Sequence, residues 1–302
     1  MNFLPSALTI GNFDGVHIGH QHLIARIREG AMRLDAKAAV LTFDPHPACV
    51  VAPERAPRLL TTMAERTALL EKAGVEQIFA LPFTREIAKL TPEEFVRDFV
   101  AGVMRARLVV VGGNFRFGHK QSGDTKTLAQ LGERYGFETL IAEPVTCRGR
   151  IVSSSLVRGC ISAGDVKDAW RLLARPYTIA GDVIQGRGVG SKQTVPTLNL
   201  RTDAQVLPGN GVYVTRTRAG EWSWNSITNI GVRPTFEDSH ELSIETFLLS
   251  AFDGDTPAKI EIEFLHRVRE ERKFESPEAL RAQIMRDVAR AKSFFRHSHD
   301  LR

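Results

Sequence analysis

One stretch of the sequence constrains the fold more than any other: residues 11–21 read GNFDGVHIGHQ. The apolar run before it, residues 7–10, indicates a short strand, and Gly11 and Gly15 indicate a tight turn. From His17 onward, apolar residues recur at helical spacing. The stretch therefore predicts a strand, a glycine turn and a helix, with His17 and His20 on one face of the first helical turn.

This arrangement predicts a phosphate site. The first backbone N–H groups of a helix lack partners and carry partial positive charge, which attracts phosphate. Two histidine donors beside them can bind a polyphosphate and stabilise charge that develops on it. Two other interpretations stay open: His17 and His20 could be ordinary surface residues, or they could bind a metal, with Asp14 as the one nearby candidate for a third ligand.

Length and composition indicate an ordinary globular protein of two domains, because the chain has 302 residues, 43% of them hydrophobic and 25% charged. No apolar stretch is long enough to cross a membrane, and we expect no signal peptide. The three cysteines form no CxxC motif, which favours a reducing cytoplasm. The net charge of +5 is spread along the chain, so we expect small anionic substrates rather than nucleic acid or membrane partners.

Alternating strand and helix patterns fill the first half of the chain. Further strands are predicted at 38–43, 77–81, 108–111 and 139–142, and helices at about 62–74, 92–104, 124–136 and 165–173. Continuous apolar strands in βα units predict a doubly wound parallel α/β sheet covered on both faces. Ligands of such sheets bind beyond the carboxyl ends of the strands, so the motifs after the first, second and fourth strands should share one edge.

The pattern changes near residue 176 and predicts a second domain. Residues 177–265 form short, often alternating runs separated by glycine, proline and asparagine, which predicts an antiparallel β-barrel. Asn210-Gly211 and Asp253-Gly254 are typical hairpin turns. Ser276-Pro277 predicts the start of a long helix that continues to about Phe294. The apolar positions of this helix that should pack on the barrel are Leu280, Ile284, Val288 and Ala291.

Four further groups of residues could bind phosphate, bind a metal ion or accept a proton. Serines 153–155 with Arg158 supply hydroxyls and a guanidinium for phosphate, and the glycines of residues 186–190 let backbone N–H groups approach phosphates. Thr197 and Asn199 lie two apart on a predicted strand and can share a Mg²⁺ ion. Glu245 is either a salt-bridged strand carboxylate or a working base, because it shares its strand face with Phe247 and Leu249.

Several of these motifs carry a family resemblance. HxGH at residues 17–20 resembles the signature of the nucleotidyltransferase superfamily, and the longer GNFDGVHIGHQ resembles its FAD synthetase branch. Residues 152–158 are similar to the ISSTxIR-like motif of that branch. Residues 112–124 resemble its VGxDFxFG…GD segment, with Asn114 where aspartate is commoner.

The second half resembles riboflavin kinases. It contains PTxN at 196–199, NIGVRPTF at 229–236, a glutamate before a Phe-Leu-Leu run and FDGD at 252–255, in the family's order. The chain therefore resembles the bifunctional bacterial riboflavin kinase/FAD synthetase over nearly its full length. It departs from the usual GRxLGFPTAN pattern, since the loop from residue 186 to 197 is longer and adds Lys192.

The resemblance implies an FMN adenylyltransferase domain at 1–176 and a riboflavin kinase barrel with a C-terminal helix at 177–302. It implies ATP, riboflavin and FMN as substrates, FAD as product, Mg²⁺ as cofactor, and Glu245 as the base for the riboflavin 5′-hydroxyl. The catalytic residues expected are Glu245, His17, His20 and Arg158. Those expected to bind ATP or phosphate are Gly11, Phe13, Asp14, Gly15, Gly19, Ser153, Ser154, Gly186, Gly188, Gly190 and Lys192. Thr197 and Asn199 are expected to bind metal, and Asp44, Asn114, Phe115, Phe117 and Arg233 the flavin.

Two alternatives stay open. The barrel could be a flavin-binding module without kinase activity, which would leave an FMN adenylyltransferase alone. The chain could also be a non-catalytic regulator that binds flavin or RNA, for which its sequence pI near 9.3 is the only indication. The sequence does not specify an oligomeric state.

Overall fold

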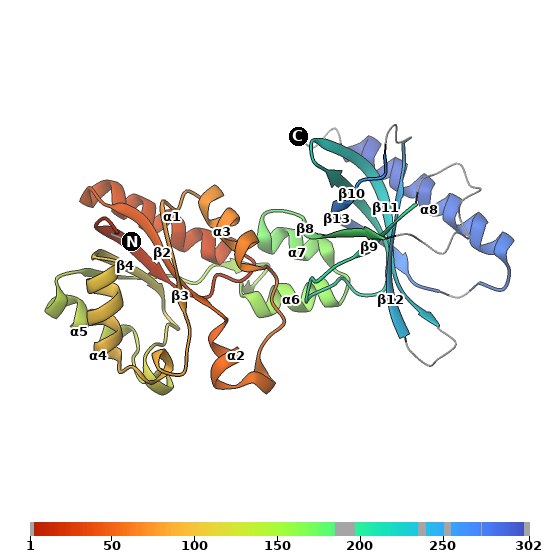
Figure 1. Cartoon of the computed structure of the whole chain (residues 1–302). Helices are drawn as coiled ribbons and strands as arrows, with labels where there is room; N and C mark the ends of the chain where they lie inside the picture. Colours follow the sequence, from red (N-terminus) through yellow and green to blue (C-terminus); the bar gives the residue numbers. More distant parts are fainter. Residues whose placement is uncertain (1–2, 185–196, 235–239, 251–254, 273, 299–302) are drawn as a thin grey trace. The chain divides into compact units, whose positions relative to one another are not determined.

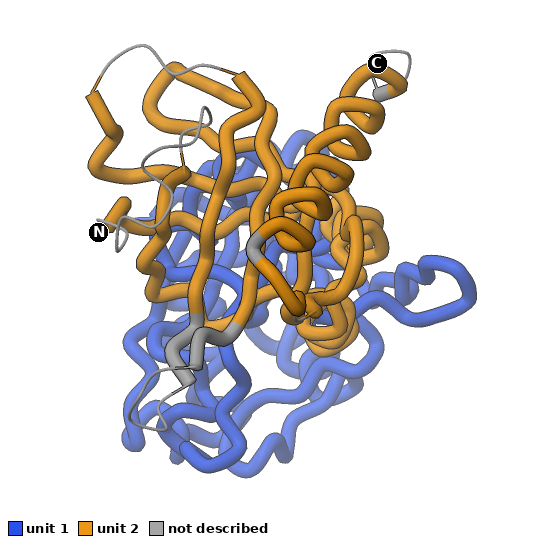
Figure 2. The backbone as a smooth tube through the Cα atoms, turned by 90° about the vertical axis from the view of Figure 1, so that its right-hand side faces the viewer, with its two compact units in different colours: residues 1–154 blue, residues 155–302 orange. Residues whose placement is uncertain are grey.

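The computed structural model describes residues 3–184, 197–234, 240–250, 255–272 and 274–298. Its contacts divide the chain into two compact units, Met1–Ser154 and Ser155–Arg302, which Figure 2 colours separately. The predicted domain boundary at 176/177 lies inside the second of these units, after its first two helices. It stays a prediction about how function is divided along the chain.

A five-stranded parallel sheet forms the centre of the first unit, in the order β3-β2-β1-β4-β5 (Figure 1). Its strands are β1 (Ser6–Ile10), β2 (Lys37–Asp44), β3 (Gln77–Pro82), β4 (Ala106–Gly112) and β5 (Glu138–Ala142). β1 lies between β2 and β4, where the strand order reverses. This confirms the predicted doubly wound sheet, and such a reversal opens a crevice at the carboxyl ends of the strands.

Helices cover both faces of this sheet. The α-helices are α1 (Ile18–Leu34), α2 (Pro47–Val51), α3 (Met63–Lys72), α4 (Pro92–Phe95) and α5 (Thr125–Tyr135). Shorter or wider turns are η1 (Pro53–Arg55), η2 (Ile87–Lys89), the π-type helix η3 (Val96–Val103) and η4 (His119–Gln121). Ala7 of β1 packs with α1 and α3, while its neighbour Leu8 packs with α4, η3 and α5. Successive side chains of a strand point to opposite faces of the sheet, so each apolar strand contributes residues to the hydrophobic cores on both faces.

The helix limits follow the predicted capping residues. Thr62 and Glu65 form the capping box of α3, and Asp124 caps α5, which ends at Gly136 in the left-handed conformation. The helix predicted over residues 92–104 differs in kind, because after Phe95 it continues with π-type hydrogen bonds to Val103. A two-stranded hairpin, β6 (Thr146–Cys147) and β7 (Arg150–Ile151), precedes the second unit.

The second unit contains a closed antiparallel barrel in the order β10-β11-β12-β9-β8-β13, as the alternating pattern predicts. Its strands are β8 (Tyr177–Ile184), β9 (Thr197–Arg201), β10 (Gly211–Ala219), β11 (Trp222–Pro234), β12 (His240–Leu248) and β13 (Lys259–Glu270). Its helices are α6 (Ser154–Ser162), which starts on the last residue of the first unit, α7 (Val166–Leu173) and α8 (Pro277–Ser298). None of the described helices combines the length and hydropathy that a membrane span requires.

Three details of this half correct the sequence analysis. The serines at 153–155 stand at the start of α6, a helix that the sequence analysis did not predict. Asn210-Gly211 is not a hairpin turn, because β9 and β10 are not neighbours in the barrel. The hairpin between β10 and β11 turns at Gly220 instead, where φ is +56°. The other predicted hairpin turn, Asp253-Gly254, lies outside the described residues.

The barrel buries a cluster of hydroxyls among apolar side chains in its interior, and it has an apolar patch on its outer face. Hydroxyls of Thr215, Ser226 and Thr228 are fully buried, and Thr215 Oγ1 lies 2.8 Å from each of the other two. Outside, α8 packs on the barrel through Ala291, which is fully buried, and Val288, as predicted. Leu280 differs from the prediction, since it is 42% exposed.

Candidate active sites

A compact bend joins β1 to α1 in the first unit. The Gly11 N–H donates to the Leu41 carbonyl at 3.1 Å, and the Val16 N–H donates to the Phe13 carbonyl at 3.1 Å. Phe13, Gly15 and Val16 have φ values of +50°, +79° and +41°. Two of these are non-glycine residues in a disfavoured conformation, and both bury their side chains in the core. Packing therefore fixes the strained backbone of this bend, as is common at functional sites.

Asp14 ties the bend to the segment before α3. Its carboxylate accepts hydrogen bonds from the Leu60 and Thr61 N–H groups at 2.9 and 3.1 Å. The Gly15 N–H in turn donates to Thr61 Oγ1 at 3.1 Å. Asp14 is predicted to bind phosphate, yet its carboxylate is buried and serves the architecture of the bend. Whether its backbone also meets a ligand stays a prediction.

Arg66 of α3 lies buried next to Asp14, and the sequence analysis did not single it out. Its Nη2 atom is 3.9 Å from Asp14 Oδ1, and both side chains are 2% exposed. The same nitrogen donates to the Thr61 carbonyl at 3.4 Å. Burial lowers the pKa of Arg66, against the opposing effect of Asp14 and Asp44. The sequence did contain a signal for this pair. Arg66 lies one helical turn before Leu70 and so on the same face of the predicted helix, and an arginine that faces a core needs a buried acidic partner.

The two histidines stack at the start of α1. Their ring centroids are 3.6 Å apart, and His17 Nδ1 accepts a hydrogen bond from the His20 N–H at 3.3 Å. His17 is thus the N-cap and precedes the first helical turn, in which the sequence analysis placed it. A Cβ on Gly19 would lie 3.1 Å from the His17 ring, so a larger residue at this position would require the ring to shift by a few tenths of an ångström.

Burial lowers the pKa of His20 well below its usual value, and the nearby His17 and Arg66 lower it further. His20 is therefore neutral near pH 7. Its Nδ1 atom is buried and has no hydrogen-bond partner among the described residues. A neutral imidazole can donate a hydrogen bond to a phosphate oxygen, but it brings no net charge.

The serine segment meets the bend. Ser154 Oγ donates to the Asp14 carbonyl at 2.9 Å, within the first unit. A Cβ on Gly19 would lie 3.8 Å from the Val152 carbonyl, so the chain before Ser154 also runs past α1. Arg158 lies one turn further along α6, where its guanidinium donates to Ser155 Oγ at 3.2 Å.

The metal interpretation of the histidines finds no support in the described part of the chain. Nowhere in it do three or more His, Cys, Asp or Glu residues form a group that could hold a metal ion. The one candidate for a third ligand, Asp14, already accepts two backbone hydrogen bonds.

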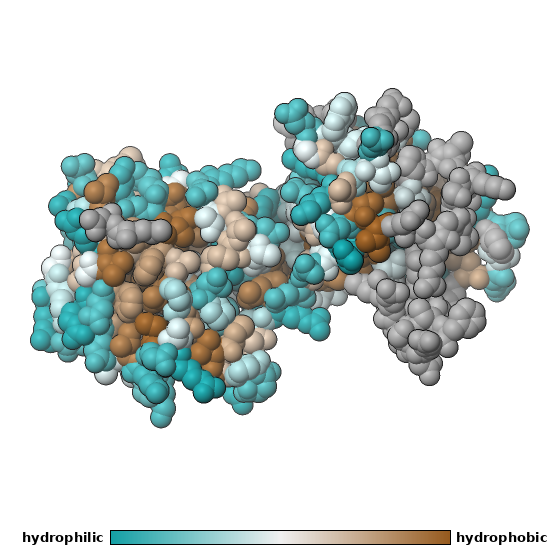
Figure 3. Space-filling view, viewed as in Figure 1, coloured by the Kyte–Doolittle hydropathy of each residue, from teal (hydrophilic) through white to brown (hydrophobic). Residues whose placement is uncertain are grey.

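A cavity of about 980 Å³ opens at the carboxyl edge of the sheet. It contains the predicted Gly11, Asn114, Phe115 and Phe117, and the two phenylalanine rings stack at 5.4 Å. Asp44 is not among its lining residues. Its basic side chains are Arg85, Lys89, Arg116 and Lys120, and none of its lining residues is acidic. In the space-filling view, apolar side chains gather in the middle of the visible face of this unit, between hydrophilic rims (Figure 3). Aromatic walls with cationic groups suit a planar anion.

A second candidate site lies on the outer face of the barrel. Glu245 of β12 is paired directly with Asn199 of β9 on one side and with Asn229 of β11 on the other. Thr197 is likewise paired with Phe247. Directly paired residues project from the same face of a sheet. The register therefore brings Thr197, Asn199 and Glu245 together on one face, although 46 residues separate Asn199 from Glu245.

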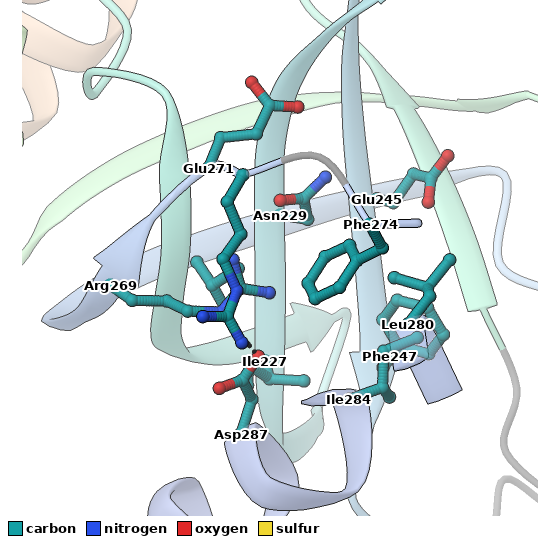
Figure 4. Close-up of a pocket in the computed structure, with 12 residues that line it drawn as sticks. Ile227, Asn229, Glu245, Phe247, Arg269, Glu271, Phe274, Leu280, Ile284 and Asp287 are labelled. Atoms are coloured by element: carbon teal, nitrogen blue, oxygen red, sulfur yellow. Dashed lines mark hydrogen bonds and ion pairs between the residues drawn. The ribbon is translucent and has the colours of Figure 1, made fainter. Parts of the chain in front are cut away.

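A pocket of about 340 Å³ opens between this face and α8. Phe247, Phe274 and Leu280 form one side of it, while Arg269 and Asp287 lie opposite (Figure 4). Asn229 and Glu245 lie above the Phe274 ring in this view. Ser243 Oγ donates to Glu245 Oε1 at 3.3 Å. The pocket thus combines apolar walls with an amide and with charged side chains, which are Glu245, Glu271, Asp287, Arg269 and Arg272. Apolar walls with a few polar groups suit a mostly apolar ring with a polar tail.

Part of this pocket consists of residues that the sequence motifs do not identify. Asn229 belongs to a quoted motif but received no role, and Arg269, Phe274 and Asp287 belong to no motif. Only strand register and the packing of α8 bring these residues together. The remaining predicted site residues, Gly186, Gly188, Gly190 and Lys192, lie outside the described residues, as does the side chain of Arg233.

The chain is similar to known proteins over almost its entire length. A family model described as FAD synthetase matches residues 2–156, and one described as riboflavin kinase matches residues 173–295. A bifunctional riboflavin kinase/FMN adenylyltransferase from Pseudomonas fluorescens is 37% identical, covering 94% of this chain and 91% of its own. The protein of the same name from Escherichia coli K12 is 33% identical, covering 95% and 92%.

A solved structure shares the fold of both parts. It is titled a macrolide-efflux protein from Streptococcus pneumoniae, and it superposes with a TM-score of 0.87 at 28% sequence identity. The match covers 95% of this chain and 94% of that one.

Proposed function

Because the chain belongs to the family of bifunctional riboflavin kinase/FMN adenylyltransferases, we propose that its two candidate sites divide two reactions. The barrel phosphorylates riboflavin to FMN with ATP. The α/β unit transfers AMP from a second ATP to FMN, which gives FAD and pyrophosphate. The observation that carries this assignment is that each family model covers one kind of fold, and each fold holds its own candidate site.

In the kinase reaction, Glu245 is proposed to accept the proton of the riboflavin 5′-hydroxyl as this oxygen attacks the γ-phosphorus of ATP. The pocket beside Glu245 supports this role, since its apolar walls can hold the flavin ring while the ribityl chain reaches the carboxylate. Ser243 orients one carboxylate oxygen by its hydrogen bond. The glycine loop and Lys192 are proposed to hold the ATP phosphates.

The oxygens of Thr197 and Asn199 fit a magnesium ion by their chemistry, because hard oxygen donors suit Mg²⁺ and both residues lie on the face of Glu245. When bound, Mg²⁺ neutralises phosphate charge. Thr197 and Asn199 are proposed to hold this ion. Glu245 is directly paired with Asn199, so its carboxylate can orient the riboflavin 5′-hydroxyl beside the ion.

In the adenylyl transfer, the FMN phosphate already carries negative charge and needs no strong base. Catalysis is therefore proposed to be positioning and charge stabilisation. His17, His20 and the N-terminus of α1 lie at the bend and are proposed to bind the ATP phosphates, with Ser153 and Ser154 contributing from the segment that meets the bend. The catalytic role predicted for Arg158 stays a proposal. The aromatic, cationic cavity with Asn114, Phe115 and Phe117 is proposed to hold FMN. A cytoplasmic location also stays a proposal.

The test is to incubate the full chain with riboflavin, ATP and Mg²⁺ and to follow FMN and FAD by chromatography. We expect FMN to appear first and FAD to follow. FAD formed from supplied FMN but never from riboflavin would show that the barrel is a flavin-binding module only. Steeply salt-dependent RNA binding without any ATP turnover would instead support a regulator.

A further inference from the structure

The barrel and helix α8 are joined by a buried ion pair on the pocket wall. Arg269 Nε of β13 lies 2.8 Å from Asp287 Oδ2 of α8, and the two side chains are 16% and 3% exposed. Both line the pocket that contains Glu245 (Figure 4). We call these two residues the clasp. Charge-assisted hydrogen bonds of this kind have a narrow range of lengths and angles, so the clasp fixes the distance between β13 and α8 at this point.

A network behind the clasp holds Asp287 in place. Asp287 Oδ1 accepts a hydrogen bond from Gln283 Nε2 at 2.7 Å, and Gln283 is itself buried. Gln283 Oε1 accepts from Arg286 Nη2 at 2.8 Å and from Arg272. Because the hydrogen bond from Gln283 fixes Oδ1 of Asp287, its Oδ2 is held in one orientation toward Arg269 of the barrel.

The same arginine approaches the aromatic wall of the pocket. The guanidinium of Arg269 lies 5.7 Å from the ring centroid of Phe274, and that of Arg272 lies 5.0 Å from it. Phe274 precedes α8 and shares the pocket with Phe247 and Leu280. Cations over an aromatic face attract it, so the clasp also restrains Phe274.

Strand register connects the clasp to the proposed base. Glu245 is paired with Asn229, Asn229 with Val212, and Val212 with Arg269, so all four project from one face of the barrel. The barrel thus places Glu245 and Arg269 in one row of residues. The ion pair of Arg269 with Asp287 fixes the distance between that row and the residues of α8 that line the pocket.

We propose that Arg269 and Asp287 are positioning residues for the kinase reaction, which fix the width of the riboflavin pocket against Glu245. The inference depends on the proposed function of the barrel. Neither Arg269 nor Asp287 takes part in the chemical step. The pair affects how tightly riboflavin binds, because less conformational entropy is lost when a ligand enters a preformed pocket.

The test compares Asp287→Asn with wild type in the full chain, by steady-state kinetics of FMN formation and of FAD formation from supplied FMN. We expect the KM for riboflavin to rise about tenfold or more, since small misplacements of a pocket wall have effects of this size or larger. The kcat of the kinase, its KM for ATP and FMN adenylation should stay within about twofold. A clasp that serves folding alone would lower the amount of active enzyme, and hence the apparent kcat, without moving the riboflavin KM.

Two further variants keep the test decisive. The double variant Arg269→Met/Asp287→Leu removes both charges, so that no buried charge is left alone and folding is preserved. It should show the same rise in riboflavin KM. Glu263→Gln is the matched control, because Glu263 lies on β13 like Arg269 but does not line the pocket. The substitution removes its ion pairs with Arg216 (3.8 Å) and Arg218 (2.9 Å) of β10 and should leave every kinetic constant unchanged.

The outcomes separate the two claims. An unchanged riboflavin KM in Asp287→Asn and in the double variant would overturn the role of the clasp while leaving the kinase assignment intact. Failure of the wild type and of Glu263→Gln to form FMN would overturn the proposed function of the barrel itself.

Discussion

At the residue scale, His20 shows how the surroundings of a side chain alter its chemistry. The sequence identifies two imidazoles near a helix start, but it cannot say whether they are charged. Burial, and after it the charges of the neighbouring His17 and Arg66, lower the pKa of His20 and keep it neutral near pH 7. The helix N-terminus must therefore supply much of the positive potential at this site.

This pKa shift predicts a pH-dependent stability. The unfolded chain takes up a proton on His20 below about pH 6.5, whereas the folded chain does not, so the unfolding free energy should fall as pH decreases from 6.5. One proton changes this free energy by at most about 1.4 kcal/mol per pH unit. Urea unfolding followed by far-UV circular dichroism at pH 7 and pH 5 measures the effect.

His20→Gln provides the comparison, because glutamine does not titrate. The variant should lose less stability than wild type between pH 7 and pH 5. Equal losses in both proteins would show that His20 titrates normally in the folded state. Any loss of stability between pH 7 and pH 5 would then be caused by the titration of other groups.

At the scale of the elements, capping residues and glycines determine how α1 sits on the sheet. Gly30 faces β4, and a Cβ there would lie 2.2 Å from Leu108 Cδ2. Helical spacing predicts α1 and its buried face, but it cannot show that one helical position must be a glycine. That requirement arises from a close approach to a strand about 80 residues further along the chain.

We therefore predict that Gly30→Ala destabilises the first unit by about 1–3 kcal/mol through overpacking. Gly159→Ala in α6 is the matched control, because a Cβ there has nothing within 4 Å. It should stabilise its helix by about 0.5–1 kcal/mol. All three tryptophans, Trp170, Trp222 and Trp224, lie in the second unit. Circular dichroism should report the loss in Gly30→Ala while tryptophan fluorescence stays unchanged, and a gain in stability would contradict the packing of α1 described above.

At the scale of the whole molecule, each unit has its own hydrophobic core and its own candidate site. The bend and the cavity beside it belong to the α/β unit, and the row through Glu245 belongs to the barrel. Variants of the two sites should therefore separate the two reactions.

We predict that His20→Ala lowers FAD formation and spares FMN formation, whereas Glu245→Gln does the reverse. Loss of the general base should reduce the kinase rate by about 10²–10⁴-fold. FMN formation is measured with riboflavin as substrate, and FAD formation with supplied FMN. If either substitution abolished both reactions in a folded protein, the proposed division between the sites would be wrong.

The sequence by itself determined the local elements and the class of chemistry. Capping boxes, glycine turns and apolar periodicity are short-range signals, and they predicted α1, α3, α5, the parallel sheet and the barrel. They did not predict α6. They also failed at Asn210-Gly211, where the outcome depends on which strands become neighbours.

Only the tertiary structure decided which distant residues meet. Register placed Asn199 and Asn229 on either side of Glu245, and packing buried Arg66 under Asp14 and joined Arg269 to Asp287. The physical reason is that local propensity acts over a few residues. Pairing, burial and the pKa shifts that follow from them depend on segments far apart in the chain.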